Sequence, residues 1–254
     1  MKKIISVILV ISLLLLQLIP VAAMDAGDAK TAWLEAKMHS KDMQEQHQDA
    51  KIAHAADPTE ENKEEVVITG KALMYAALDE AESWLVWKKL EAQENPLVPE
   101  DIRESIEDDV EANIDKIDEL RTDVDGVTNP LELGLVFLKM VGKYTELLTD
   151  VARNSGTVWV HIANVHADTI ADFEEKLRDV AITDEVSDLL DKANEELNSA
   201  KDNINDAEGA FGDVKLPGTP LLKFSEGNSY LRAARMNMVG AHKYLNQAYI
   251  AMLG

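Results

Sequence analysis

The segment TDEVSDLLDKANEELNSAKDNINDAEG, residues 183–209, carries the clearest structural signal in the sequence. Its apolar side chains recur at spacings of three and four: Val186, Leu190, Ala193, Leu197, Ala200, Ile204 and Ala207. Residues with this spacing share one face of an α-helix, so the segment predicts a helix that buries one stripe. Thr183, followed by Asp184 and Glu185, is typical of a helix start, because oxygens and negative charge satisfy the free N–H groups there.

The same periodicity extends outward through every other long segment, and no convincing alternation of period two occurs. Proline and glycine punctuation divides the chain into helices expected at about 28–56, 58–94, 99–126, from 129, 158–180, 183–209 and 220–253. Residues 154–157, Asn-Ser-Gly-Thr, are either a turn or a weak point in one very long helix. The sequence therefore predicts an all-α fold of about seven helices in antiparallel bundles.

Two segments stand out within this pattern. Residues 131–141 form the most apolar run after the N-terminal segment, and we expect them near the centre of the core. Residues 209–219, GAFGDVKLPGT, form the one long loop that the pattern predicts. Long loops in compact bundles often carry function, although a plain surface connection explains this one as well.

A faint repeat suggests a duplicated three-helix unit. Residues 101–126 and 184–209 match in length, apolar stripe and terminal glycine, and each precedes a proline-opened helix that contains Met-Val-Gly, at 140–142 and 238–240. Similar helix starts and stops that arose independently would give the same pattern.

The N-terminus has the features of a secretory signal peptide. Lys2 and Lys3 precede an apolar run, and Val21-Ala22-Ala23 supplies the small residues of a cleavage site. An uncleaved membrane anchor is the alternative, since the run is almost long enough to span a bilayer. We expect residues 1–23 to be the signal peptide, 24–156 a four-helix bundle and 157–254 a three-helix unit.

Composition narrows the function classes. The net charge is −22, with 47 acidic against 25 basic residues, and such a surface repels nucleic acid and anionic lipid. We therefore expect no nucleic-acid partner and no membrane contact beyond an uncleaved anchor. The absence of cysteine excludes thiolate nucleophiles and Cys-ligated metal centres. Because no catalytic motif occurs, the sequence predicts a protein that is not an enzyme.

A transition-metal site is one alternative that the residues leave open. Glu35, His39, Met43 and His47 are spaced by four along the first predicted helix, so neighbouring side chains lie close enough to share an ion. Imidazole and thioether groups suit copper, nickel or zinc. His161, His166 and His242 would add ligands if their helices approached. Packing of Met43 and His47 in a helix interface accounts for the same pattern.

Residues 121–132 have a second, weaker metal-binding pattern. They resemble a degenerate EF-hand or dockerin calcium loop, with Asp123, Asp125, Asn129 and Glu132 at ligand positions and a glycine at position six. Arg121 stands where the first carboxylate is required. The end of one helix at Gly126 and the start of the next at Asn129 also explain the segment.

These observations favour a non-enzymatic exported protein of the cell envelope or extracellular space of a prokaryote. We expect it to act as a binding or structural component, through a protein partner or self-association of its helical surfaces. The alternative is an extracytoplasmic protein that binds copper, nickel or zinc through the first predicted helix, with calcium as a more remote choice; otherwise we expect no cofactor.

Overall fold

The computed structural model describes residues 25–180 and 183–252, and the regular structure in these ranges is entirely helical. The described helices are α2 (Ala26–Ala56), α3 (Glu60–Glu94), α4 (Glu100–Asp125), α5 (Pro130–Arg178), α6 (Asp184–Gly212) and α7 (Pro220–Met252). The all-α prediction is confirmed. None of these helices combines the length and apolarity needed to cross a membrane. The predicted signal peptide, residues 1–23, lies outside the described residues.

Within the described ranges there are six helices instead of about seven, because α5 continues through residues 154–157. Thr157 lies within the helix, and its hydroxyl donates a hydrogen bond to the carbonyl oxygen of Arg153, at 3.2 Å. Gly156 is buried where Phe211 of α6 packs against α5. Tertiary packing thus outweighs the weak helix propensity of this segment. At 49 residues, α5 is about 73 Å long.

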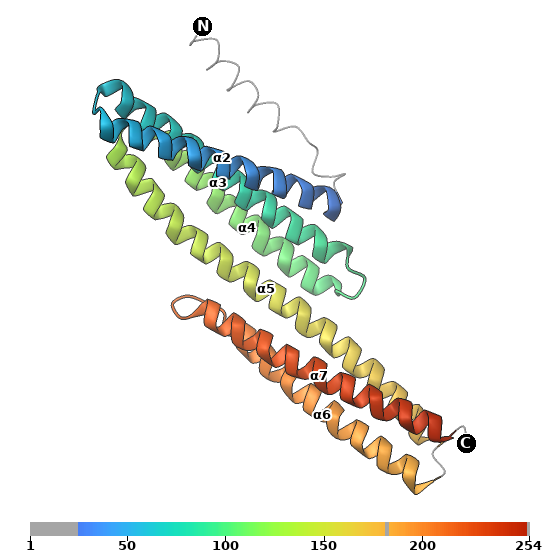
Figure 1. Ribbon diagram of the computed structural model, residues 1–254. Helices are drawn as coiled ribbons and strands as arrows, with labels where there is room; N and C mark the ends of the chain where they lie inside the picture. Colours follow the sequence, from blue (N-terminus) through green and yellow to red (C-terminus); the bar gives the residue numbers. More distant parts are fainter. Residues whose placement is uncertain (1–24, 181–182, 253–254) are drawn as a thin grey trace.

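The molecule is elongated, and α5 runs along most of its length (Figure 1). Its N-terminal half packs against α3 and α4, and α2 contacts only α3 among the described helices. Its C-terminal half packs against the antiparallel pair α6 and α7. The domain boundary expected between residues 156 and 157 falls inside α5, between Val151, the last buried residue of one core, and Val160, the first buried residue of the next.

Close packing of small side chains joins α6 to α7. Alanines seven residues apart are fully buried on both helices: Ala193, Ala200 and Ala207 on α6, and Ala234, Ala241 and Ala248 on α7. A seven-residue repeat of this kind keeps one seam facing the partner helix, and alanine allows the two backbones to come close. The predicted apolar stripe of residues 186–207 is confirmed in full.

The loop before α7 is shorter than expected because α6 extends to Gly212. Phe211, only 1% exposed, continues the buried stripe of α6 beyond Ala207. Its ring lies between Gly156 of α5 and Gly227 of α7, two positions where a Cβ atom would collide with it. This contact fixes where the α6–α7 pair sits along α5.

Candidate functional site

The apolar segment 131–141 lies mostly at the surface, so the expectation that it occupies the centre of the core is wrong. Leu133 alone in this run is buried, and Val136 and Met140 are half-buried against α3 and α4. The opposite face of α5 carries Leu131, Leu135, Leu138 and Val141, which are 50–74% exposed. We call these four residues the α5 stripe. The segment is apolar on both sides of the helix, and the described part of the chain covers only one.

Further along α5, the face that carries the α5 stripe becomes an interface within the chain. There, the residues at the same helical spacing are Ala152, Gly156, Val160, Ala163 and Ala167, which pack against α6 and α7. Positions three and four apart lie on one side of a helix, so both sets belong to one face. The α6–α7 pair covers the C-terminal half of this face and ends beside the middle of α5 (Figure 1). The N-terminal half is left exposed.

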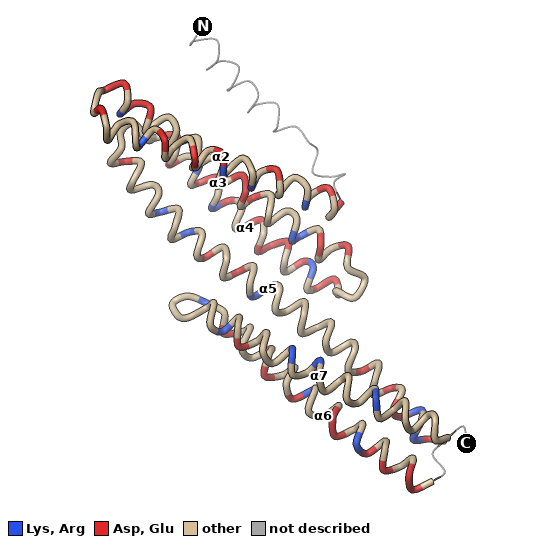
Figure 2. Tube along the Cα trace, in the orientation of Figure 1, with Lys and Arg blue, Asp and Glu red and all other residues tan. Residues whose placement is uncertain are grey.

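The neighbourhood of the α5 stripe is electrically neutral in a strongly acidic protein. Residues 130–149 contain two acidic and two basic residues, whereas the whole chain carries −22. Lys139 is paired with Asp123, and Lys143 lies 3.1 Å from Glu146. Figure 2 shows few charges along this half of α5 and many acidic positions on α2, α3 and α4. Another acidic surface is therefore repelled less at the stripe than over the acidic surfaces of α2, α3 and α4.

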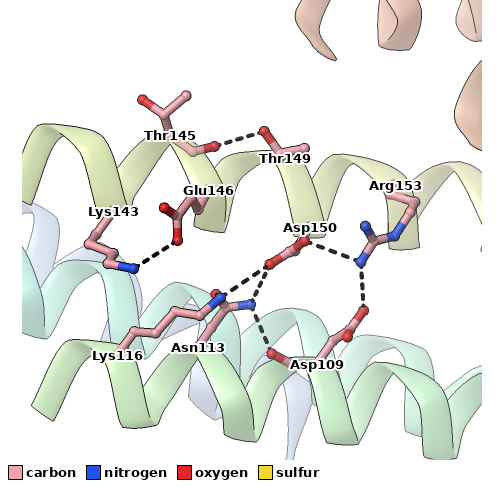
Figure 3. A network of polar contacts seen from close by, with 9 residues as sticks. All are labelled: Asp109, Asn113, Lys116, Lys143, Thr145, Glu146, Thr149, Asp150 and Arg153. Carbon is pink, nitrogen blue, oxygen red and sulfur yellow. Dashed lines mark hydrogen bonds and ion pairs between the residues drawn. The ribbon is translucent and has the colours of Figure 1, made fainter. Parts of the chain in front are cut away.

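On its inner side, α5 is fixed to α4 by a polar network (Figure 3). Asp150 accepts a hydrogen bond from the buried amide of Asn113 at 3.2 Å and from Arg153 at 3.1 Å, and lies 3.7 Å from Lys116. Arg153 also reaches Asp109 at 3.1 Å. Each carboxylate has a cationic partner, and networks of this kind specify one arrangement of neighbouring helices. The network holds the α5 stripe facing outward.

The predicted transition-metal site lies at the edge of the contact between α2 and α3, with two of its residues in the contact and two outside it. Met43 and His47 are half-buried there, while Glu35 and His39 are exposed. The Nδ1 atom of His47 lies 3.1 Å from the Thr69 hydroxyl on α3. Burial, with a smaller contribution from a neighbouring lysine, lowers the pKa of His47 below its usual value. The helices that carry His161, His166 and His242 do not contact α2.

Two carboxylates of the predicted calcium loop have partners within the protein. Asp123 forms an ion pair with Lys139, and Asp125 accepts a hydrogen bond from the Tyr75 hydroxyl. Arg121 turns back toward α3 and binds carboxylates there. In residues 25–180 and 183–252, no group of three or more His, Asp or Glu side chains is arranged to hold a metal ion.

The other two predicted calcium ligands form the start of α5. Asn129 Oδ1 accepts hydrogen bonds from the backbone N–H groups of Leu131 and Glu132, at 3.1 and 3.0 Å. Glu132 in turn accepts from the backbone N–H and the hydroxyl of Thr128, both at 2.8 Å. The hydrogen bonds from Thr128 lower the pKa of the Glu132 carboxyl. This arrangement is a variant of the capping box, in which Glu132 accepts from the residue before the N-cap Asn129 and both side chains hold the helix terminus.

A second surface feature, the α5–α7 groove, lies on the C-terminal half of the molecule. It is an open groove of about 760 Å³, lined by Trp159, Ile162, Ala163, His166, Thr169 and Ile170 of α5 and by Leu231, Arg235, Met238, Val239 and His242 of α7. Its walls are largely apolar, and the charged or titratable side chains among them are basic. Sequence reasoning found neither this groove nor the exposure of the α5 stripe.

The fold and these surfaces define an elongated all-α protein organised around one long helix. Compared with known proteins, the chain matches no family model, no curated protein and no solved structure. Its function must therefore be argued from the α5 stripe and the α5–α7 groove.

Proposed function

We propose that this is a non-enzymatic, exported helical protein that acts as a structural component of the cell envelope or extracellular space, and that two copies pair through the α5 stripe. The observation that carries the proposal is the exposure of Leu131, Leu135, Leu138 and Val141 on one face of α5. The basic N-terminus, apolar run and small-residue cleavage site support export.

The first argument for a second copy is continuity with an interface already present. The same face of α5 is covered by a helical pair where α6 and α7 reach it. In the N-terminal half of α5, apolar residues recur at the same spacing, with larger aliphatic side chains, and another helix could pack against them. A two-fold axis near Leu138 would lay two stripes antiparallel, so that each surface meets its own copy.

The second argument is energetic. Burying one leucine or valine is worth roughly 1.5–3 kcal/mol, so the four residues of each copy offer a large gross gain. Association costs roughly 4–15 kcal/mol in lost freedom. Electrostatic repulsion between two acidic chains adds to this cost, and it is smaller at the neutral segment 130–149 than over the acidic helices α2, α3 and α4. We therefore expect a dimer with a dissociation constant on the order of 1–100 μM.

The test is sedimentation velocity on the chain expressed for export and purified in its processed form. We expect a concentration-dependent monomer–dimer equilibrium. Leu135→Glu combined with Leu138→Glu should leave a monomer of unchanged circular dichroism. The matched control is Ile52→Glu combined with Ile68→Glu, which places the same two charges at exposed isoleucines of α2 and α3, outside the stripe, and should leave the dimer intact. A wild-type chain that stays monomeric well above 100 μM would overturn the proposal.

We extend the proposal to the origin of the chain, as a duplicated three-helix unit with α2 added to the first copy. The support is the matched segments 101–126 and 184–209, each followed by a helix that begins at a proline, Pro130 or Pro220. Comparison of homologous sequences tests it: aligned halves should become more similar in sequences closer to the ancestral one.

A further inference from the structure

The α5–α7 groove has an apolar floor of the kind that holds an alkyl or aryl group. Its half-buried apolar residues come from both helices: Ile162, Ala163 and Ile170 of α5, and Leu231 and Met238 of α7. A volume of about 760 Å³ lies within the range of small-molecule sites. The α5 stripe contributes no residue to this groove, so the two surfaces are independent.

Trp159 forms a rigid part of the groove wall. Its ring is supported from the inside by Phe211, with ring centroids 6.4 Å apart, and by Phe224, at 5.8 Å. The remaining surface of the indole is exposed at the groove. Because aromatic neighbours already hold the ring, a ligand that stacks on it pays little to order the side chain.

The charges at the groove are opposite in sign to those of the protein as a whole. The chain has 47 acidic residues, yet no aspartate or glutamate lines the groove, whereas Arg235, His166 and His242 do. Other arginines, such as Arg121 and Arg153, bind carboxylates of the chain itself. Within residues 25–180 and 183–252, Arg235 has no such partner. A guanidinium without a carboxylate, beside an apolar floor, has the geometry and charge to bind an anion.

We propose that the α5–α7 groove binds an amphipathic monocarboxylate, with its alkyl or aryl body along the apolar floor and its carboxylate on Arg235. Charge complementarity selects this class of ligand. A cation would be repelled by the positive charge of Arg235, and a neutral apolar molecule would leave the guanidinium without an anionic partner. The carboxylate forms a two-pronged hydrogen-bonded pair with the guanidinium, and His166 and His242 lie at the same groove. This binding activity goes beyond the proposed pairing through the α5 stripe.

The test is isothermal titration calorimetry with decanoate, kept below its micelle concentration, against the full processed protein. We expect saturable one-to-one binding. Arg235→Met preserves much of the side-chain length but removes the charge, and it should weaken binding at least tenfold. The matched control is Arg232→Met, which removes an exposed arginine of the same helix that does not line the groove; it should bind as the wild type does. Decanol, which lacks the charge, should bind at least tenfold more weakly than decanoate.

The position of the ligand is tested by tryptophan fluorescence with 10-bromodecanoate, whose bromine at the end of the alkyl body quenches an indole in contact with it. Quenching should saturate with the calorimetric affinity and disappear in Trp159→Phe. Absence of decanoate binding at 1 mM would overturn the proposal. Equal affinity in the Arg235→Met and Arg232→Met proteins, or equal affinity for decanol, would also overturn it, since the groove would then bind apolar molecules without regard to charge.

Discussion

Replacing Gly156 by alanine tests the contact that joins the two halves of the molecule. A Cβ atom at this position would lie 2.8 Å from the Cβ of Phe211 and closer still to its ring. The ring has no room to retreat, because a Cβ on Gly227 of α7 would also lie within 2.7 Å of it. Adding one methyl group must therefore push α6 away from α5 or force Phe211 out of its position.

The magnitude follows from two opposing effects. At an open helical position, glycine to alanine stabilises by about 0.5–1 kcal/mol. Overpacking a closed core site costs typically about 1–3 kcal/mol, and confinement of Phe211 from both sides places Gly156 at the upper end. We expect Gly156→Ala to lower the free energy of unfolding by about 2 kcal/mol. Gly142→Ala, on the same helix with no atom near its Cβ, should raise it by up to about 1 kcal/mol.

The assay is urea unfolding followed by far-UV circular dichroism at a protein concentration below that of dimer formation. A double-mutant cycle with Phe211→Ala isolates the contact. That substitution alone should cost about 3–5 kcal/mol, and the two changes together should cost about 1–3 kcal/mol less than their sum, since the new methyl group occupies space left by the ring. Equal stabilities for Gly156→Ala and Gly142→Ala would refute the reasoning.

Asp150→Ala removes the carboxylate partner of Lys116 and one of the two carboxylates that Arg153 contacts in the α4–α5 network, and it should destabilise by about 1–3 kcal/mol in urea unfolding. Asp168→Ala, which removes an exposed ion pair with Lys201, should cost less than ~1 kcal/mol. Burial lowers the pKa of His47 in the folded state, so the unfolded chain binds the proton more readily. Stability should fall as pH drops below about 6.5, less steeply in His47→Gln, as measured by unfolding at several pH values. Copper, nickel or zinc ions should not raise the melting temperature; a rise abolished by changing His39 and His47 together to alanine would instead support the metal alternative. Mass spectrometry of the exported protein should find a start at Met24 or Asp25 and no peptide from residues 1–20.

The sequence was sufficient wherever a local signal determines local structure. Asn129 and Thr183 were expected at helix starts, and each side chain accepts a hydrogen bond from a backbone N–H group of the first turn. Pro130 and Pro220 begin helices as predicted. The apolar residues of α6 recur at helical spacing, which predicts a helix with one buried apolar side, and the structure has that helix. Caps and periodicity involve residues within a turn or two of each other, so one sequence contains them completely.

The sequence-based predictions fail where a residue's structure depends on a contact with a residue that is distant in the sequence. Read locally, Gly156 is a helix-weakening residue, and only contact with Phe211, more than fifty residues later, makes it part of a continuous helix. The apolar composition of the segment 131–141 predicts a core position, but composition does not say how many faces of a helix have partners. A helix that is apolar all round is either fully buried or carries a surface for another molecule. The same apolar composition fits a fully buried helix and a helix with an exposed apolar side. Only the positions of α3, α4, α6 and α7 show that α5 is the second kind.

The arrangement of α5 also limits what the proposed pairing can build. The α6–α7 pair occupies the C-terminal half of the face, so a second copy can reach only the N-terminal half, where the α5 stripe lies. A surface that pairs with its own copy across a two-fold axis is fully buried in the dimer, so assembly stops there. A head-to-tail contact leaves a free surface at each end, so assembly can continue into a filament. The intramolecular contact of Phe211 with Gly156 would thus act beyond stability: by holding α6 and α7 in place, it restricts assembly to a closed dimer. Variants that loosen this contact should expose more of the α5 face and give larger, polydisperse species in sedimentation velocity, whereas variants of the stripe itself should give only monomers.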